Sequence, residues 1–291
     1  MSPTITAITT YVEQQLNMCR FWTVHSVYKK TVNIQAGERF LALQAALSPM
    51  SPVSLLTDMD AGAFEALPVQ PGQQVSIDGS RIIISAPEHP VAFLFQPNKV
   101  CPTRLTCPPG QFPRGELLSR LRQAITASQA GIFRLLFRDS TDGPVINAAE
   151  EYSLILNAAR SRIRRCSQCV EQGLYGDAAK DLAGLIGLGI GLTPSGDDFL
   201  CGVLAGLILR GEENHPFTLS LRREITSRRF DTNDISRAFL DCSLEHHFSL
   251  AVNSLADLPS AERILNVFSA IGHSSGIDTL CGVAYGLSLW E

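Results

Sequence analysis

The chain contains an internal repeat of a loop followed by an apolar stretch. Ser195–Leu207 returns eighty residues later as Ser275–Leu287, with nine of thirteen positions identical and no gap. Each copy starts with Ser-Gly, carries an Asp three residues after the Ser, and continues with glycines four positions apart: Gly202 and Gly206, Gly282 and Gly286. This pattern predicts a helix with one bare face. We expect the two copies to build one core or one site.

The composition is that of an ordinary globular protein. Of the 291 residues, 45% are hydrophobic and 18% are charged, which is enough for the cores of two domains. A net charge of -4 gives no general attraction to nucleic acid or membranes, and the basic run Arg160–Arg165 is typical of a solvated helix face. Met1–Gln15 lacks the pattern of a signal peptide, and runs such as Phe199–Leu209 are too short to cross a bilayer. We expect a cytoplasmic protein without a membrane segment.

The eight cysteines are scattered along the chain. Cys201 and Cys281 occupy equivalent positions in the repeat, where a small buried apolar residue is sufficient. Cys166 and Cys169 form a C-x-x-C that has no second pair at zinc-finger spacing and no redox-type context. We predict free thiols and no metal site here.

The N-terminal part has the pattern of short strands. Val24–Ile34 interleaves β-branched and aromatic residues with polar ones, which predicts a strand that includes Lys29 and Lys30. Val75–Ile84 predicts a hairpin with Asp-Gly at its turn. Regular prolines favour a small barrel or sandwich. The Pro-rich connection 101–115 then separates a β-rich domain, residues 1–112, from a helical domain, residues 113–291.

From residue 116 the hydrophobic period becomes helical. We expect seven to nine helices, with the two repeated helices near the centre, and therefore an α+β fold. The clearest helical segments are residues 116–125, 148–170, 177–188, 232–255 and 261–271, the last capped by Ser260.

The loops before the repeated helices carry the strongest signal, and helix capping explains part of it. Ser195 with Asp198, and Ser275 with Asp278, have the spacing of a capping box. Capping does not require the alternate glycines, the stiff Thr-Pro pair, the additional carboxylate of Asp197 or a His at the second loop. Loops that combine such residues are where sites usually lie. The candidate catalytic residues are Asp197, Asp198, His273 and Asp278. The candidate substrate-binding residues are Gly189, Gly191, Thr193, Pro194, Ser195, Gly196, Ser275 and Gly276.

These loops do not match known nucleotide motifs. The segment Gly187–Gly191 lacks the G-x-G-x-x-G spacing and the preceding strand of a dinucleotide fold, and it is not a G-x-x-x-x-G-K loop. Helix starts attract anions. Two carboxylates at such a start oppose a phosphate unless Mg²⁺ or an Arg intervenes, or unless the ligand offers N–H groups instead. We expect a small ligand with an anionic end and N–H groups; no cofactor is certain from these loops, and Mg²⁺ stays open.

At these residues the chain resembles the AllH-like family of oxamate carbamoyltransferase subunits, formerly a domain of unknown function with the GLTPSGDD motif. The shared motifs are G-x-G-x-G-L-T-P-S-x-D-D at Gly187–Asp198 and G-H-x-S-G-x-D at Gly272–Asp278, with a fainter likeness over Val24–Leu43 and Thr232–Leu240. The resemblance implies one subunit of an enzyme of anaerobic allantoin catabolism, which interconverts oxalurate and phosphate with oxamate and carbamoyl phosphate. It also implies two companions, an FdrA-like subunit and a third subunit.

Within that interpretation, Thr193 and the serines position the ligand, Asp197 recognises N–H groups or Mg²⁺, and His273 transfers a proton or contacts phosphate. The chain has no S-T-R-T-type carbamoyl-phosphate loop, so we expect it to need its partners for activity. Two alternatives stay open: a non-catalytic assembly or regulatory subunit, and a carboxylase-like ATP-dependent enzyme. The β-rich domain offers no catalytic group and is assigned to docking or pocket closure, with Arg39 and Arg104 as residues that could close over a ligand.

Overall fold

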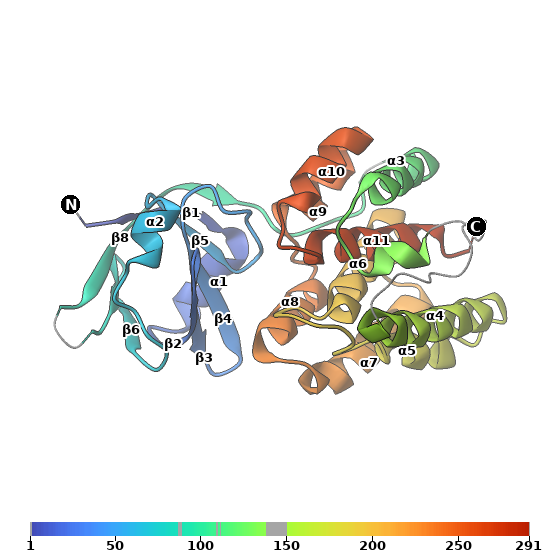
Figure 1. Ribbon diagram of the computed structural model, residues 1–291, viewed down its shortest axis with the longest axis horizontal. Helices are drawn as coiled ribbons and strands as arrows, with labels where there is room; N and C mark the ends of the chain where they lie inside the picture. The colour runs from blue at the N-terminus through green and yellow to red at the C-terminus, as the bar shows by residue number, and fades with distance from the viewer. Residues whose placement is uncertain (1, 87–88, 109, 111, 138–149, 291) are drawn as a thin grey trace. The chain divides into compact units, whose positions relative to one another are not determined.

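The structure is a computed structural model that describes residues 2–86, 89–108, 110, 112–137 and 150–290 (Figure 1). The chain forms two compact units. The first contains Met1–Arg104 and the short segment His247–Leu250; the second contains Leu105–His246 and Ala251–Glu291. The first unit is a β-barrel and the second is helical, so the predicted α+β fold is confirmed.

The first unit is a closed eight-stranded barrel with the strand order β1-β5-β4-β3-β2-β6-β7-β8. The ring closes where β1 pairs with β8 in parallel. The strands are β1 (Thr4–Thr9), β2 (Phe21–Tyr28), β3 (Thr31–Ala36), β4 (Arg39–Gln44), β5 (Ser54–Thr57), β6 (Gln74–Ile77), β7 (Arg81–Ile84) and β8 (Val91–Cys101). Two helices accompany them, α1 (Thr10–Met18) and α2 (Ala61–Glu65).

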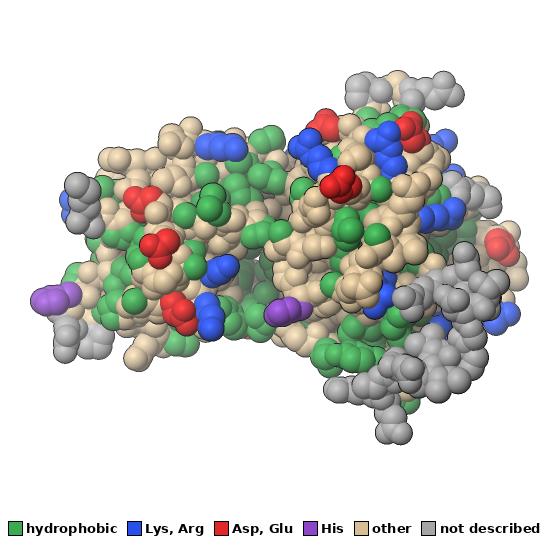
Figure 2. Space-filling model, turned by 45° about the horizontal axis from the view of Figure 1, so that its top comes forward, with side chains coloured by type: hydrophobic (Ala, Val, Ile, Leu, Met, Phe, Trp, Pro, Cys, Tyr) green, Lys and Arg blue, Asp and Glu red, His purple; other side chains and the backbone are tan. Residues whose placement is uncertain are grey.

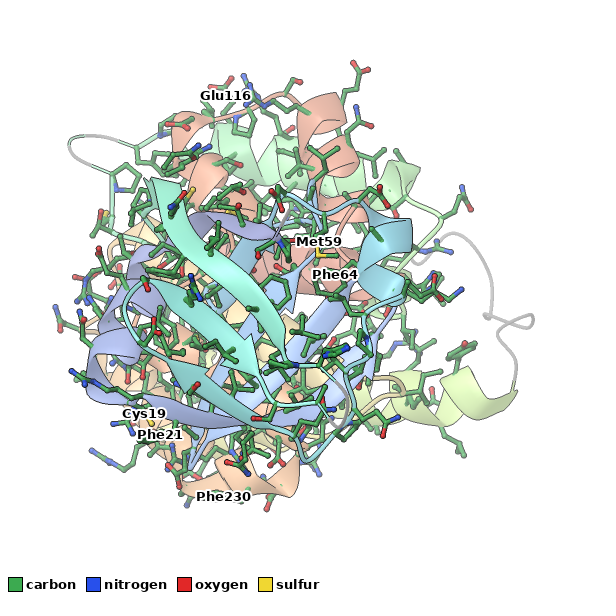
Figure 3. All side chains as sticks on the ribbon, turned by 90° about the vertical axis from the view of Figure 1, so that its left-hand side faces the viewer. Cys19, Phe21, Met59, Phe64, Glu116 and Phe230 are labelled. Atoms are coloured by element: carbon green, nitrogen blue, oxygen red, sulfur yellow. The ribbon has the colours of Figure 1, made fainter. Side chains whose placement is uncertain are left out.

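Alternate residues of the strands fill the barrel, as a closed sheet requires. Ile34 and Leu41 are fully buried, and so is Trp22, whose Nε1 donates to the carbonyl of Cys19 at 3.1 Å. Phe64 of α2 is part of this core (Figure 3). The interior of the barrel is therefore filled by a packed hydrophobic core.

The predicted hairpin is confirmed and the predicted long strand is wrong. β6 and β7 pair with Ile77 opposite Ile82, and Gly79 at the turn has φ +86°. Residues 24–34 are not one strand but parts of β2 and β3, which pair with Tyr28 opposite Thr31. Lys29 and Lys30 form the exposed turn between them, because two charged side chains are easily solvated there.

The segment His247–Leu250 completes the barrel unit from far along the chain. The amide of Phe248 donates to the carbonyl of Thr103 at 2.9 Å, and the Thr103 hydroxyl lies 2.8 Å from Nδ1 of the buried His247. The ring of His247 also packs against Tyr11, with ring centres 5.1 Å apart. A buried hydrogen-bonded link therefore joins the end of β8 to a segment almost 150 residues later.

The helical unit contains nine α-helices among the described residues, within the predicted range. They are α3 (Arg114–Ala127), α4 (Glu150–Glu171), α5 (Tyr175–Ala183), α6 (Ser195–Arg210), α7 (Pro216–Arg228), α8 (Asp234–Leu244), α9 (Leu250–Asn253), α10 (Ala261–Ser269) and α11 (Ser275–Ser288). Short 3₁₀ turns are η1 (Phe133–Leu136), η2 (Arg229–Asp231) and η3 (Ser254–Asp257). No described helix is both long and apolar enough to cross a membrane. The face shown in Figure 2 intermixes acidic and basic side chains over these helices.

Three of the predicted helices are confirmed: 116–125, 261–271 and the described part of 148–170. The predicted cap is also present, since Ser260 accepts from the amide of Arg263. Residues 148 and 149 lie outside the described residues. Two predicted helices are too long. The segment 177–188 ends its helix at Ala183, after which Gly187 takes φ +74°. The segment 232–255 breaks at His246, which has φ +67°, where the chain leaves for the barrel unit. The eight cysteines are free thiols, as predicted.

The repeated helices α6 and α11 pack directly on each other at the centre of the helical unit, as Figure 1 shows. A Cβ on Gly202 would lie 2.0 Å from the carbonyl oxygen of Thr279, and a Cβ on Gly282 would lie 2.0 Å from that of Phe199. The two contacts are equivalent, because Gly202 and Phe199 of the first copy correspond to Gly282 and Thr279 of the second, eighty residues later. The helices therefore run in the same direction and are related by a local twofold. Their backbones approach closely through the bare glycine faces, as expected if the two copies build one core.

Candidate functional site

The capping-box interpretation of the two helix starts is wrong. Ser195 and Ser275 are the first helical residues and not the caps; Pro194 and Ser274 precede them, and neither provides a side-chain cap. The amide of Asp198 instead donates to the carbonyl of Pro194 at 3.2 Å. The serines and aspartates are thus left for other contacts.

Those contacts cross from one copy of the repeat to the other. Asp278 lies beside Ser195 of the first copy, and Asp198 lies beside Ser275 of the second and beside Thr193. The hydroxyls of Thr193 and Ser275 are 2.7 Å apart. We call these five residues the carboxyl cluster. It joins side chains from the two parallel helix starts at one point, as the repeat predicted.

The two carboxyl groups of the cluster are buried next to each other. Burial raises the pKa of Asp198 well above its usual range, and the charge of Asp278 raises it further. Burial also raises the pKa of Asp278 to about 7, against the opposing effect of the Ser195 hydroxyl and the Phe133 amide. Two neighbouring buried carboxyls titrate as a pair, so the cluster retains a proton near neutral pH.

A loop after α3 holds the carboxyl of Asp278. The amide of Phe133 donates to its Oδ1 at 2.8 Å, and the Arg134 guanidinium is near enough to lower its pKa. Gly131, with φ +84°, lets this loop approach, because a Cβ there would lie 2.6 Å from Cγ2 of Ile277. Phe133 and Arg134 were not predicted from the sequence; the turn glycine, Gly131, was the signal available for them.

Asp197 faces away from the cluster and ties its own loop to α8. Its Oδ1 accepts from the amide of Gly187 at 2.9 Å, and its Oδ2 accepts from the hydroxyls of Thr232 and Ser236, both at 2.6 Å. Burial raises its pKa, and the Ser236 and Thr232 hydroxyls oppose that rise. Both carboxylate oxygens are therefore occupied. Thr232 and Ser236 were also missed, since nothing in their spacing links them to Asp197.

The glycines of the first loop serve close packing. A Cβ on Gly189, which has φ +139°, would lie 2.4 Å from the amide nitrogen of Ser195. Cβ atoms on Gly196 and Gly276 would lie 2.0 Å from the carbonyl oxygens of Leu185 and Phe268, respectively. The loop thus folds tightly back onto the start of α6.

Three further predicted residues contribute no side-chain group to the cluster. Gly191 is exposed and takes φ +95°. Pro194 precedes α6, and its carbonyl accepts from the amides of Asp197 and Asp198. His273 is exposed on the loop before α11. The structure thus gathers Thr193, Ser195, Asp198, Ser275 and Asp278 and leaves His273 toward solvent.

Several oxygens in the cluster have no hydrogen-bond partner among the described residues: Ser195 Oγ, Asp198 Oδ2 and Asp278 Oδ2, all buried. The described residues also contain no group of three or more His, Cys, Asp or Glu side chains that could hold a metal. A cation such as Mg²⁺ would have only two carboxylates and hydroxyls here. The arrangement can accept hydrogen bonds and carry a proton.

Comparison with known families covers both units. The model described as "Oxamate carbamoyltransferase subunit AllH" matches residues 185–287, which contain both copies of the repeat and the whole carboxyl cluster. The model described as "AllH family N-terminal domain" matches residues 4–97, which form nearly all of the barrel. No solved structure gives a significant match. The chain therefore belongs to the AllH family of oxamate carbamoyltransferase subunits.

Proposed function

We propose that this subunit takes part in carbamoyl transfer between oxalurate and phosphate, in the catabolism of allantoin and purine nitrogen, with the carboxyl cluster at the reacting site. The observation that supports this most is the burial of Asp198 and Asp278 beside each other with one oxygen of each left without a donor. A buried pair of this kind needs an explanation beyond packing, and perturbed carboxyls are typical of proton-transfer sites.

The reaction sets a clear demand on such a pair. A phosphate oxygen attacks the carbamoyl carbon of oxalurate, the bond from that carbon to the bridging nitrogen breaks, and carbamoyl phosphate and oxamate form. The nitrogen leaves as the amide of oxamate and takes up one proton, which phosphate gives up overall. A carboxyl whose pKa is about 7, as for Asp278, can relay that proton at neutral pH.

The other residues have supporting roles in this proposal. Thr193 and Ser275 position the ligand above Asp198, and His273 contacts phosphate from the exposed loop. Asp197 holds the loop in place through its three hydrogen bonds, so the N–H recognition predicted for it passes to Asp198 and Asp278. The family description supports companion subunits; an FdrA-like protein and a third subunit are the proposed partners, in the cytoplasm, without nucleic acid or membrane.

The test uses the assembled enzyme. The three subunits are co-purified, and carbamoyl phosphate formation from oxalurate is measured for Asp198→Asn and Asp278→Asn. Each should lose at least about 100-fold in rate, the usual scale for a proton-transfer group. Asp177→Asn, in the first turn of α5, is the matched control and should keep full activity. Full activity of a folded Asp198→Asn, Asp278→Asn double variant would exclude the cluster from the chemistry.

A second candidate is an assembly subunit without chemistry of its own. It is favoured by Ile190 and Leu192, which are 44% and 52% exposed on the loop before α6. If this loop only joins subunits, Ile190→Asp with Leu192→Asp should release the chain from the complex, while the two Asn variants leave the rate unchanged. Size-exclusion chromatography and the same assay separate the two candidates.

A further inference from the structure

We infer that the helical unit contains a second binding site, a cavity that takes a small organic cation with a guanidinium or ammonium group. The cavity has a volume of about 640 Å³ and lies where the ends of α4 and α11 meet the start of α5. A volume of this size is typical of sites for small ligands. The carboxyl cluster lies at the opposite end of α11, about 20 Å away along the helix, so the two sites are separate.

The walls of the cavity are aromatic. Three rings line it: Tyr175, Tyr285 and Trp290. His215 supports two of them, because its ring centre lies 4.8 Å from that of Tyr175 and 4.4 Å from that of Trp290. The third ring is held against α4, where the hydroxyl of Tyr285 lies 2.9 Å from that of Ser167. The faces of aromatic rings attract cations, so these walls suit a positively charged ligand and are already held in place.

The charge around the cavity is negative. Among the described residues, Glu171 is the only charged one in the lining, and it forms no ion pair with another of them. Glu171 is also the last residue of α4, as Ser288 is of α11, and neither helix has a basic side chain in its last turn. The carbonyl end of a helix is partially negative and favours cations. A cation in the cavity therefore meets a carboxylate and the negative ends of two helices.

The neighbouring groups do not reverse this preference. Arg210 donates to the carbonyl of Leu287 and lies over the Trp290 ring, 5.3 Å from its centre, but it does not line the cavity. His215 is neutral, because its Nδ1 accepts from a backbone amide. The indole N–H of Trp290 is buried without an acceptor among the described residues, but it is a single uncharged donor. The carboxylate of Glu171 therefore decides the sign of the ligand.

The experiment uses the full chain with Trp22→Phe, so that tryptophan fluorescence comes from Trp290 in the cavity wall. The probes are butylguanidinium, butylurea and pentanoate, which are similar in shape and carry a positive charge, no charge and a negative charge. We expect butylguanidinium to change the fluorescence and to bind at least about 10-fold more tightly than the other two. Calorimetry on the unmodified chain repeats the comparison, so that a folding defect of Trp22→Phe does not decide it.

Three results would overturn the inference. These are equal binding of butylurea, tighter binding of pentanoate, and no binding of butylguanidinium in either measurement.

Variants locate the binding at the cavity. Glu171→Gln keeps the size of the side chain and removes its charge, and should weaken butylguanidinium about 5-fold while leaving butylurea unchanged. Glu262→Gln, the same change at an exposed position of α10, is the control and should have no effect. Tyr175→Leu should weaken butylguanidinium about 2- to 5-fold, whereas Tyr175→Phe keeps the ring and should bind normally. Unchanged affinity in a folded Glu171→Gln or Tyr175→Leu protein would contradict the assignment.

The outcome is separable from that of the proposed function. Asp198→Asn, which should slow carbamoyl transfer in the assembled enzyme, should leave butylguanidinium binding unchanged. A complex that forms carbamoyl phosphate while its chain binds no butylguanidinium would keep the function and contradict the site. A chain that binds butylguanidinium in a complex without activity would keep the site and contradict the function.

Discussion

The two copies of the repeat deliver a carboxyl group to the same point but hold it differently. In the first copy the preceding residue, Asp197, accepts three hydrogen bonds that hold the loop, and Asp198 keeps an oxygen without a partner. In the second copy that preceding residue is Ile277, which packs beside Gly131. Asp278 must then accept the Phe133 amide itself.

This difference shows how the two copies of a repeat can come to have different roles. The first copy has two adjacent carboxylates, so Asp197 holds the loop while Asp198 faces the cluster. The second copy combines both roles in Asp278, and the hydrogen bond from Phe133 limits how far that side chain can turn. Asp198 is accordingly the more available of the two carboxyls, and also the more exposed, at 9% against 0%.

The largest expected effect tests whether the copies are equivalent in packing. Gly202→Ala and Gly282→Ala should each cost about 3 kcal/mol, the upper end of the usual range for overpacking, because the new Cβ would meet a backbone carbonyl of the facing helix. Unfolding in urea is followed by tryptophan fluorescence in a Trp22→Phe background. Trp290 is then the single tryptophan, so the signal reports on the helical unit. Gly176→Ala, with open space around it, is the control and should be neutral or stabilising. Clearly unequal losses of stability for the two alanine variants would contradict equivalent packing of the two copies.

The next effect concerns pH. The folded-state pKa of Asp278 is raised to about 7, above its ordinary value of 3.8, so the folded protein holds a proton that the unfolded chain releases. The contribution of Asp278 to the free energy of unfolding should therefore be largest at and below about pH 4 and should fall up to about pH 7, by at most about 4 kcal/mol. Asp198 and Asp197, also raised, act in the same direction.

Denaturation at pH 5, 6, 7 and 8 measures this slope. Asp278→Asn should flatten it, and the exposed Asp177→Asn should not. Stability that rises over the same interval would show that the pair is ionised and held by a partner outside the described residues.

A smaller effect compares the residues that precede the two carboxyls. Asp197→Ala removes the acceptor of one amide and two hydroxyls and should cost about 2–3 kcal/mol. Ile277→Val at the equivalent position should cost about 0.5–1.5 kcal/mol. Thermal melting of both variants ranks them. If the Ile277 variant proves the more damaging, anchoring does not reside in Asp197.

The smallest expected effect is the coupling energy of the hydroxyl contact between the two copies. Thr193→Val and Ser275→Ala should show a coupling energy of about 0.5–1.5 kcal/mol in a double-mutant cycle, because their hydroxyls share a hydrogen bond. Thr193→Val combined with Ser227→Ala, an exposed hydroxyl on α7, should be additive. Additivity of the first pair as well would mean that the contact carries no energy.

Local patterns in the sequence predicted much of the fold. Asp-Gly between two β-branched runs was enough for the hairpin of β6 and β7, and Ser260 marked the start of α10. The interrupted helix after Thr232 was not predictable in the same way. Its break follows from contacts with Thr103, which are distant in sequence and leave no periodic signal.

The site shows the same limit. The repeat indicated that the two helix starts would meet, and they do. A Ser and an Asp three residues apart suit a cap within one copy as well as a pair between copies, so the spacing could not reveal that Ser195 lies beside Asp278. Phe133 and Thr232 reach the site through loops whose sequences carry no motif.

The link between Thr103 and His247 has a consequence for synthesis. Domains commonly fold as they leave the ribosome, beginning with the N-terminal one. Here the barrel lacks its last segment until residues 247–250 have been translated, with more than four fifths of the 291 codons already read. A nascent chain that stops short of that point presents Tyr11 and Thr103 without their buried histidine partner. Truncated products should thus be favoured substrates for chaperones and proteases.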